Sequence, residues 1–138
     1  MNSDDFFEMQ ELPKSMCVIG GGYIGCELAG IMNALGVKVT LVVRSIIMRE
    51  MDRDIVDLLM KEMEKHGIEI KLGTNLKNVR QEPDGRLGIT VVNQQGIESK
   101  VFAEKCLYAA GRPPLIDGLN LENTAVKTEK GVIIVDEF

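Results

Sequence analysis

A glycine-rich loop between an apolar run and a helix-forming segment constrains this sequence more than any other feature. Residues 16–19 are apolar and predict a buried parallel strand that stops at the loop Gly20-Gly21-Gly22-Tyr23-Ile24-Gly25. The loop fits G-x-G-x-x-G in the strand–loop–helix context that this pattern requires. The first glycine permits a tight turn, the second lets the backbone approach a pyrophosphate, and the third lets helix and strand pack closely. The loop therefore predicts a nucleotide whose phosphates bind at a helix N-terminus.

Helix and strand signals alternate on the C-terminal side of the loop. The first predicted helix ends at Gly36, and its expected buried stripe consists of Ile24, Leu28, Ile31 and Leu35. A strand rich in β-branched residues follows at 37–43. A second helix is predicted from about Asp52 to His66, followed by a short strand at 68–71. The expected buried face of that helix consists of Ile55, Leu59 and Met63, flanked by Val56 and Met60. This βαβαβ order folds through right-handed crossovers into a parallel sheet.

The pattern changes after residue 75, where no helix-length periodicity is found. Strands are predicted at 76–81, 86–92 and 99–103, joined by turns, and they form an antiparallel meander in place of the usual crossover helix. An apolar run at 105–110 is expected to return to the parallel sheet. A last strand-like piece at 132–135 has no obvious neighbour. The predicted fold class is α/β: a Rossmann-like three-layer domain with a parallel sheet, helices and a β-meander crossover.

The residues after the second strand indicate which dinucleotide the loop binds. Sites for NAD place an Asp or Glu at the end of that strand to bind the ribose hydroxyls. Here Val43 holds that place and is followed by Arg44 and Ser45, with Arg49 farther along. Guanidinium groups and a hydroxyl favour a 2′-phosphate, so the predicted cofactor is NADPH. The missing acid also argues against S-adenosylmethionine, while two solvated loop arginines remain the alternative interpretation.

Composition excludes several other classes. The net charge is −5, which disfavours nucleic acid or an anionic membrane as partner, and no apolar run reaches membrane length. The three cysteines, Cys17, Cys26 and Cys106, are far apart in sequence. We therefore expect buried free thiols, no metal site and a reducing compartment, the cytoplasm or another intracellular one.

Four stretches carry a resemblance to a known family. GGGYIGCELAG, VTLVVRSIIMREMD, CLYAAGRPP and GVIIVDEF resemble the NADPH domain of the pyridine nucleotide–disulfide oxidoreductases. The likeness covers essentially the whole chain and is greatest to the glutathione reductase and thioredoxin reductase branch. Gly25 departs from the alanine that is common at the third glycine position of NADP-binding members.

The resemblance implies roles for particular residues. The cofactor-binding set would be Gly20, Gly22, Tyr23, Ile24, Gly25, Arg44, Ser45, Arg49 and Gly111. Within it, Arg44, Ser45 and Arg49 would hold the 2′-phosphate. Tyr23 would be a movable lid on the nicotinamide side of the flavin, and Glu27 would lie near the nicotinamide; these two form the implied catalytic pair.

Members of this family are FAD-containing homodimers in which NADPH, FAD and a redox disulfide act in line. The resemblance implies a linker from the FAD domain at 1–14, the NADP(H)-binding domain at 15–112, and a return segment toward the FAD domain at 113–138. The family's FAD loop and disulfide motif are not in this sequence. We therefore expect an excised domain that positions NADPH but does not turn over a disulfide substrate alone. A stand-alone NADP(H)-binding regulatory or redox-sensing module is the alternative.

Overall fold

A parallel sheet forms the centre of the molecule in the computed structural model, which describes residues 1–136. Its strands are β1 (Ser15–Ile19), β2 (Lys38–Val42), β3 (Glu69–Lys71) and β7 (Lys105–Tyr108), in the order β3-β2-β1-β7. All three pairings are parallel, as the βαβαβ pattern predicts. The order places the first strand of the sequence beside both the second and the last, which is one half of a Rossmann sheet. The predicted Rossmann-like α/β fold is confirmed.

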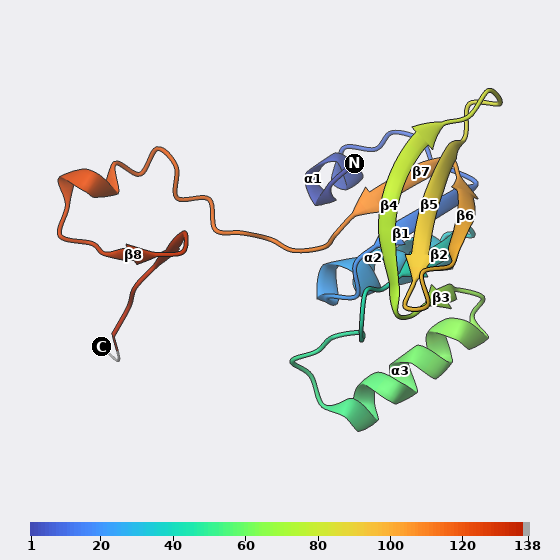
Figure 1. Cartoon of the computed structure of the whole chain (residues 1–138), viewed down its shortest axis with the longest axis horizontal. Coiled ribbons are helices and arrows are strands. Elements are labelled where there is room, and N and C mark those ends of the chain that lie inside the picture. The colour runs from blue at the N-terminus through green and yellow to red at the C-terminus, as the bar shows by residue number, and fades with distance from the viewer. Residues whose placement is uncertain (137–138) are drawn as a thin grey trace.

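Both faces of this sheet are buried, and each contributes to a separate core. Along β1, Met16 and Val18 face one core, whereas Cys17 and Ile19 face the other. This alternation follows from the period of two in a strand. The first core contains the residues of the helical layer, and the second contains the inner side chains of the meander. The predicted three layers are therefore helices, parallel sheet and meander (Figure 1).

The helical layer contains α2 (Tyr23–Ala34) and α3 (Arg53–Lys65), close to the predicted ranges. The predicted buried faces are partly wrong. Helix α2 buries Gly25, Cys26, Leu28, Ala29 and Met32. Ile31 and Leu35 are exposed because the helix is rotated to bring its small residues against the sheet. In α3, Val56 and Met63 are buried and Ile55 is 69% exposed, so the apolar stripe is turned partly to solvent.

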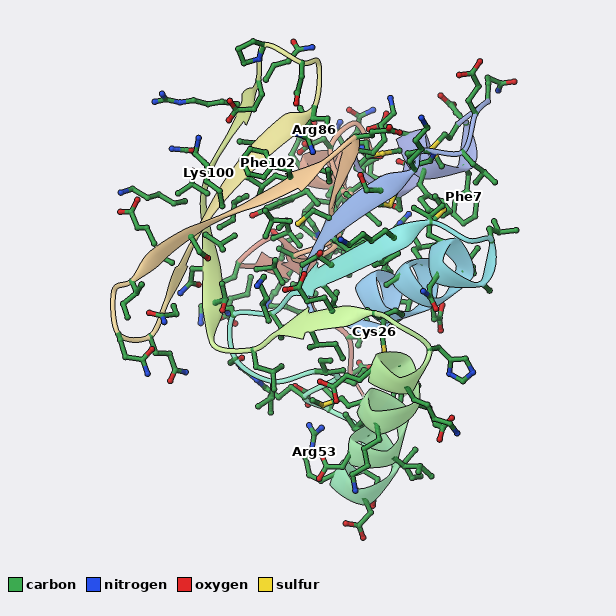
Figure 2. All side chains as sticks on the ribbon, turned by 90° about the vertical axis from the view of Figure 1, so that its right-hand side faces the viewer. Phe7, Cys26, Arg53, Arg86, Lys100 and Phe102 are labelled. Carbon is green, nitrogen blue, oxygen red and sulfur yellow. The ribbon has the colours of Figure 1, made fainter. Side chains whose placement is uncertain are left out.

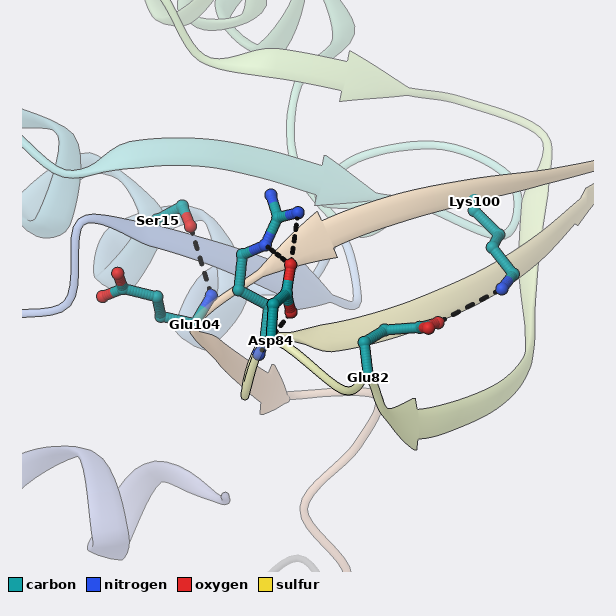
Figure 3. Close-up of polar contacts among 6 residues, drawn as sticks. Ser15, Glu82, Asp84, Lys100 and Glu104 are labelled. Carbon is teal, nitrogen blue, oxygen red and sulfur yellow. Dashed lines mark hydrogen bonds and ion pairs between the residues drawn. The ribbon is translucent and has the colours of Figure 1, made fainter.

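The meander covers the other face of the sheet with β4 (Thr74–Gln81), β5 (Leu87–Asn93) and β6 (Glu98–Ala103), all antiparallel. The predicted strands are confirmed. Two ion pairs lie on its surface (Figure 3). One joins Asp84 and Arg86 within the β4–β5 turn, and the other joins Glu82, at the start of that turn, to Lys100 on β6. Where β6 turns into β7, the backbone N–H of Glu104 donates to Ser15 Oγ at 3.1 Å, fixing the meander to β1.

The N-terminal segment, expected to be a linker, contains regular structure. Residues 1–14 contain a short helix, α1 (Ser3–Phe7), whose N-cap Asn2 forms a capping box with Asp5. Phe6 is buried in the helical-side core, and the backbone N–H of Tyr108 donates to the Met1 carbonyl beside β7. Local capping and one buried aromatic side chain thus order a segment that has no helical periodicity.

The three cysteines are free thiols, but only two of them are buried. Cys17 and Cys26 are buried, and Cys106 is half-buried, which corrects the expectation for the third. Cys17 and Cys106 are register partners on β1 and β7. The pKa of the Cys17 thiol is raised because it hydrogen-bonds to Cys106 and is buried.

Beyond β7 the chain leaves the body and runs outward in an extended stretch (Figure 1). It contains a 3-10 turn, η1 (Leu121–Asn123), and a hairpin of β8 (Thr128–Glu129) with β9 (Val132–Ile133). The strand-like piece at 132–135 therefore has a neighbour, across a two-residue turn at Lys130-Gly131 in which both φ angles are positive. The last two residues of the GVIIVDEF motif lie outside the described residues. Within residues 1–136, none of the helices is long and apolar enough to cross a membrane.

Candidate nucleotide-binding site

An open groove of about 480 Å³ lies at the carboxyl end of the parallel sheet. In sheets of this topology, ligands bind at this end, where the strand order reverses next to the first strand. Three segments far apart in the sequence form most of the groove wall: the glycine loop, the loop after β2 and the residues after β7. Its volume is within the range of sites for small ligands and cofactors.

The glycine loop is sterically determined at two of its motif positions. Gly20 has φ +124°, and a Cβ there would lie 2.3 Å from the Ala109 carbonyl oxygen. A Cβ on Gly25 would lie 2.2 Å from the Gly20 carbonyl oxygen. Alanine at position 25 is therefore excluded by this loop's own closure, which explains the departure from the family pattern without reference to the cofactor. At Gly22 a Cβ would meet nothing within 4 Å, because that position faces open space.

The first turn of α2 leaves its backbone donors available. Its N-cap is Gly22, which has no side chain to cap the helix, and no acidic residue lies in the first turn. The unpaired N–H groups of a helix start carry partial positive charge and bind anions. Because Gly22 lies in the groove wall, this helix end can receive a phosphate group.

The loop after β2 brings the predicted basic residues into the same groove. Arg44, Ser45 and Arg49 all line it, and Arg49 Nη2 donates to Ser45 Oγ at 2.9 Å. Both arginines are exposed, so their guanidinium groups are hydrated and accessible to a ligand. Glu50 also lines this part of the groove and contributes one opposing charge. The structure thus brings the two sets of predicted cofactor residues together.

The remaining predicted residues divide into two groups. Tyr23, Ile24 and Gly111 line the groove, and Tyr23 is 56% exposed at the first position of α2. Glu27 lies one turn farther along the helix, exposed and outside the groove lining. Its expected place near a nicotinamide therefore stays a prediction. Gly111 has φ +152° with open space around its Cβ position, so the chain turns there beside the groove.

Several lining residues were missed by the sequence analysis. Thr74, Asn75 and Leu76, at the start of β4, enter the groove because the backbone N–H of Thr74 donates to the Val43 carbonyl. Gly21 was assigned no role, yet a Cβ there would lie 2.6 Å from Val43 Cγ1 and 3.3 Å from the Ile46 carbonyl oxygen. The unbroken run of three glycines was the signal that this middle position is also crowded.

Cys26 is a buried thiol on the same helix as the groove-lining residues Tyr23 and Ile24. Cys26 lies in the first turn of α2, where a helix N-terminus ordinarily lowers a thiol pKa. Burial, together with the charge of Glu27, instead raises its pKa to about 11, so Cys26 stays protonated near neutral pH. Over the described residues, histidine, cysteine and acidic side chains form no group of three or more that would hold a metal ion.

The sequence is similar to a known family and to several of its members. The family model for pyridine nucleotide-disulphide oxidoreductase matches residues 1–138. Glutathione reductase of Yarrowia lipolytica is 37% identical over 140 residues, which cover 100% of this chain and 30% of the relative. The mitochondrial thioredoxin reductase 2 of Drosophila melanogaster is 40% identical over 139 residues, covering 99% of this chain and 27% of the relative.

A solved structure shares the fold. It is a Cu(II) complex of a mutant of the HOCl-induced flavoprotein disulfide reductase RclA from Escherichia coli, with 25% sequence identity and a TM-score of 0.84. The match covers 99% of this chain and 30% of that one. The chain thus spans less than a third of the length of the proteins it matches. Since the family model matches over the full length, the chain belongs to the pyridine nucleotide–disulfide oxidoreductases, a family of oxidoreductase enzymes.

Proposed function

We propose that this chain is the NADPH-binding domain of an FAD-dependent disulfide reductase and that it positions NADPH for hydride transfer to the flavin. One observation carries the proposal: Arg44, Ser45 and Arg49 line the same groove as the glycine loop. A pyrophosphate on the glycine loop leaves the adenosine ribose near the end of the second strand, where these three side chains lie.

The charge at the end of β2 distinguishes among the dinucleotides. The adenosine ribose of FAD or NADH carries free hydroxyls, which favour an acidic acceptor at that strand end. Here Val42 and Val43 are followed by an arginine, and the acidic residue of the groove, Glu50, comes only after Arg49. A 2′-phosphate instead receives charge-assisted hydrogen bonds from guanidinium groups. This argument supports NADPH over FAD as the occupant of the groove.

Each part of the groove would then have one task. The N-terminal amides of α2 bind the pyrophosphate, and Arg44, Ser45 and Arg49 bind the 2′-phosphate. Tyr23, exposed at the start of α2, would cover the nicotinamide side. NADPH supplies a hydride, and the flavin, held elsewhere in the parent chain, would receive it. The remaining domains, a homodimeric assembly and the disulfide substrate belong to this same proposal, supported by relatives more than three times as long.

The deciding experiment is calorimetric titration of the chain with NADPH, NADH, 2′,5′-ADP and FAD at two salt concentrations. Two arginines at a partly exposed site should favour NADPH over NADH by about 2–4 kcal/mol, roughly 30- to 1000-fold, and the preference should shrink with salt. The Arg44→Glu variant should lose most of it because a carboxylate repels the phosphate. Arg80→Glu, the same charge change at an exposed position on β4 outside the groove, is the matched control.

Two outcomes would overturn the proposal. Equal affinity for NADPH and NADH would remove the 2′-phosphate assignment. Tight binding of FAD with no binding of NADPH would assign the glycine loop to the flavin instead.

A further inference from the structure

The loop that carries the predicted phosphate-binding arginines, residues 44–52, is fastened to the body at its middle. Ile47 is fully buried in the helical-side core. Met48 adopts a left-handed conformation with φ +43°, and its backbone N–H donates to the Gly21 carbonyl at 2.7 Å. Together these contacts join the arginine-bearing loop to the glycine loop.

A third tie comes from α3. The guanidinium of Arg53 donates from Nη1 to the Ile47 carbonyl oxygen at 3.0 Å, so the first residue of the helix holds the loop that precedes it. Figure 2 shows Arg53 at the N-terminal end of α3. Arg53 is exposed and does not belong to the groove lining.

The position of Arg53 is unfavourable for the helix itself. Cations destabilise a helix N-terminus because the helix dipole is positive there. The neighbouring Asp52 and Asp54 are the residues that suit this end, and Asp52 caps it. A guanidinium at the first helical position therefore needs another explanation, and the hydrogen bond to Ile47 provides one.

We propose that Arg53 is a positioning residue: it holds the 44–52 loop against the glycine loop and thereby sets the selectivity for NADPH over NADH. This inference rests on the proposed function. In the proposed complex the 2′-phosphate, which only NADPH has, meets the arginines of that loop, whereas the pyrophosphate common to both dinucleotides meets the glycine loop. The glycine loop has its own supports: the Gly20 N–H donates to the Val42 carbonyl at 2.9 Å, and Gly25 packs on Gly20. Loosening the 44–52 loop therefore costs NADPH affinity and leaves NADH affinity unchanged.

The test compares Arg53→Met with Lys61→Met, which removes the same charge from an exposed position of the same helix. We expect Arg53→Met to weaken NADPH binding about tenfold, the scale of one hydrogen bond to a charged group, with NADH affinity changed less than about twofold. Lys61→Met should leave both affinities unchanged. Arg53→Lys, which keeps the charge and one donor nitrogen, should restore part of the selectivity.

NADPH affinities measured at high salt distinguish a positioning role of Arg53 from a long-range attraction between its charge and the phosphate. At 1 M salt the screening length falls to about 3 Å, so a mere charge effect of Arg53 on the phosphate would vanish. The ratio of NADPH affinities between wild type and Arg53→Met should persist there, because a misplaced loop stays misplaced. Hydrogen exchange gives a readout without ligand: the Met48 amide should exchange faster in Arg53→Met than in Lys61→Met.

The outcomes distinguish this inference from the proposed function. A wild-type chain with no preference for NADPH contradicts both. A wild-type preference that Arg53→Met leaves intact, or equal losses for NADPH and NADH, overturns the inference alone. Circular dichroism checks that each variant is folded, and Arg53→Lys provides a second variant should Arg53→Met fail to fold.

Discussion

Helices α2 and α3 begin in opposite ways although both follow a strand of the same sheet. The start of α3 is satisfied by the protein: the Asp52 carboxylate accepts from the backbone N–H groups of Asp54 and Ile55, at 3.0 and 3.3 Å. The start of α2 has Gly22 as its N-cap, no capping side chain and no acid in the first turn. One helix end is closed by the chain's own anion, and the other is left open in the groove.

Under the proposed function, this difference keeps the start of α2 available for a ligand. Unpaired N–H groups at a helix start are destabilising unless something accepts from them, and an aspartate cap contributes about 1 kcal/mol. At Gly22 the backbone has φ −76° and open space around the Cβ position, so an aspartate would fit. Glycine there provides no capping side chain although the geometry allows one, and under the proposed function the phosphates of the dinucleotide take that place.

The largest effect is expected from giving α2 an aspartate N-cap like that of α3. In Gly22→Asp, the new carboxylate caps α2 and occupies the place of the pyrophosphate. Dinucleotide affinity should fall about 100-fold or more, because like charges placed together cost several kcal/mol. Urea unfolding of the free protein should show unchanged or higher stability, by up to about 1 kcal/mol. A stable Gly22→Asp variant that still binds dinucleotide at wild-type affinity would contradict a ligand-binding role for the uncapped start of α2. Gly22→Asn, an uncharged cap, shows whether the loss comes from the charge of the new side chain or from its size.

The converse change removes the cap from α3. Asp52→Ala should lower the free energy of unfolding by about 1 kcal/mol, since two N–H groups lose their acceptor. Asp52→Asn keeps a capping oxygen and should lose at most a few tenths of that. Urea denaturation monitored by circular dichroism measures both variants. Equal stability of Asp52→Ala and wild type would mean that α3 does not depend on its cap and that the contrast with α2 is only geometric.

The smallest effect is expected at Tyr23, beside the open end of α2. Tyr23 as a whole residue is 56% exposed, and its ring belongs to no aromatic pair among the residues described. Tyr23→Ala should change NADPH affinity by less than about 1 kcal/mol, the scale of one exposed aromatic contact. In the intact enzyme it should alter the rate of hydride transfer more than binding, which stopped-flow reduction of the flavin would measure. Loss of binding in the isolated chain would make Tyr23 a structural anchor instead of a lid.

Local patterns predicted the elements well and their orientation less well. The strands of the parallel sheet, both long helices and the meander all lie close to their predicted ranges. The predicted stripe of α2 placed Ile31 and Leu35 inside, but the structure buries Gly25, Ala29 and Met32. Hydrophobicity alone selects the largest side chains, whereas close approach of a helix to a strand selects the smallest ones. That preference depends on the partner surface, which periodicity does not contain.

In the candidate site, too, some residues were predicted from local sequence and others are placed there by tertiary contacts. Its glycine loop and the arginines after β2 were predicted from residue type and spacing, because a phosphate requires backbone donors and cations that the sequence displays directly. Thr74, Asn75 and Leu76 join them only because the N–H of Thr74 bonds to Val43 across the sheet. From the sequence, Arg53 is likewise an ordinary helix residue. Only the structure shows that its guanidinium donates a hydrogen bond to the Ile47 carbonyl.

The sequence by itself determined the strand–loop–helix unit, the absence of an acid after β2 and the three motif glycines, since each is recognised from residues within a few positions. Only the tertiary structure decided that Gly21 and Met48 are joined, that a Cβ on Gly20 would meet Ala109, and that the start of β4 completes the groove. These contacts join atoms that chain folding brings within a few ångströms of each other. Their energies depend on separation in space, which no local pattern of residue types specifies.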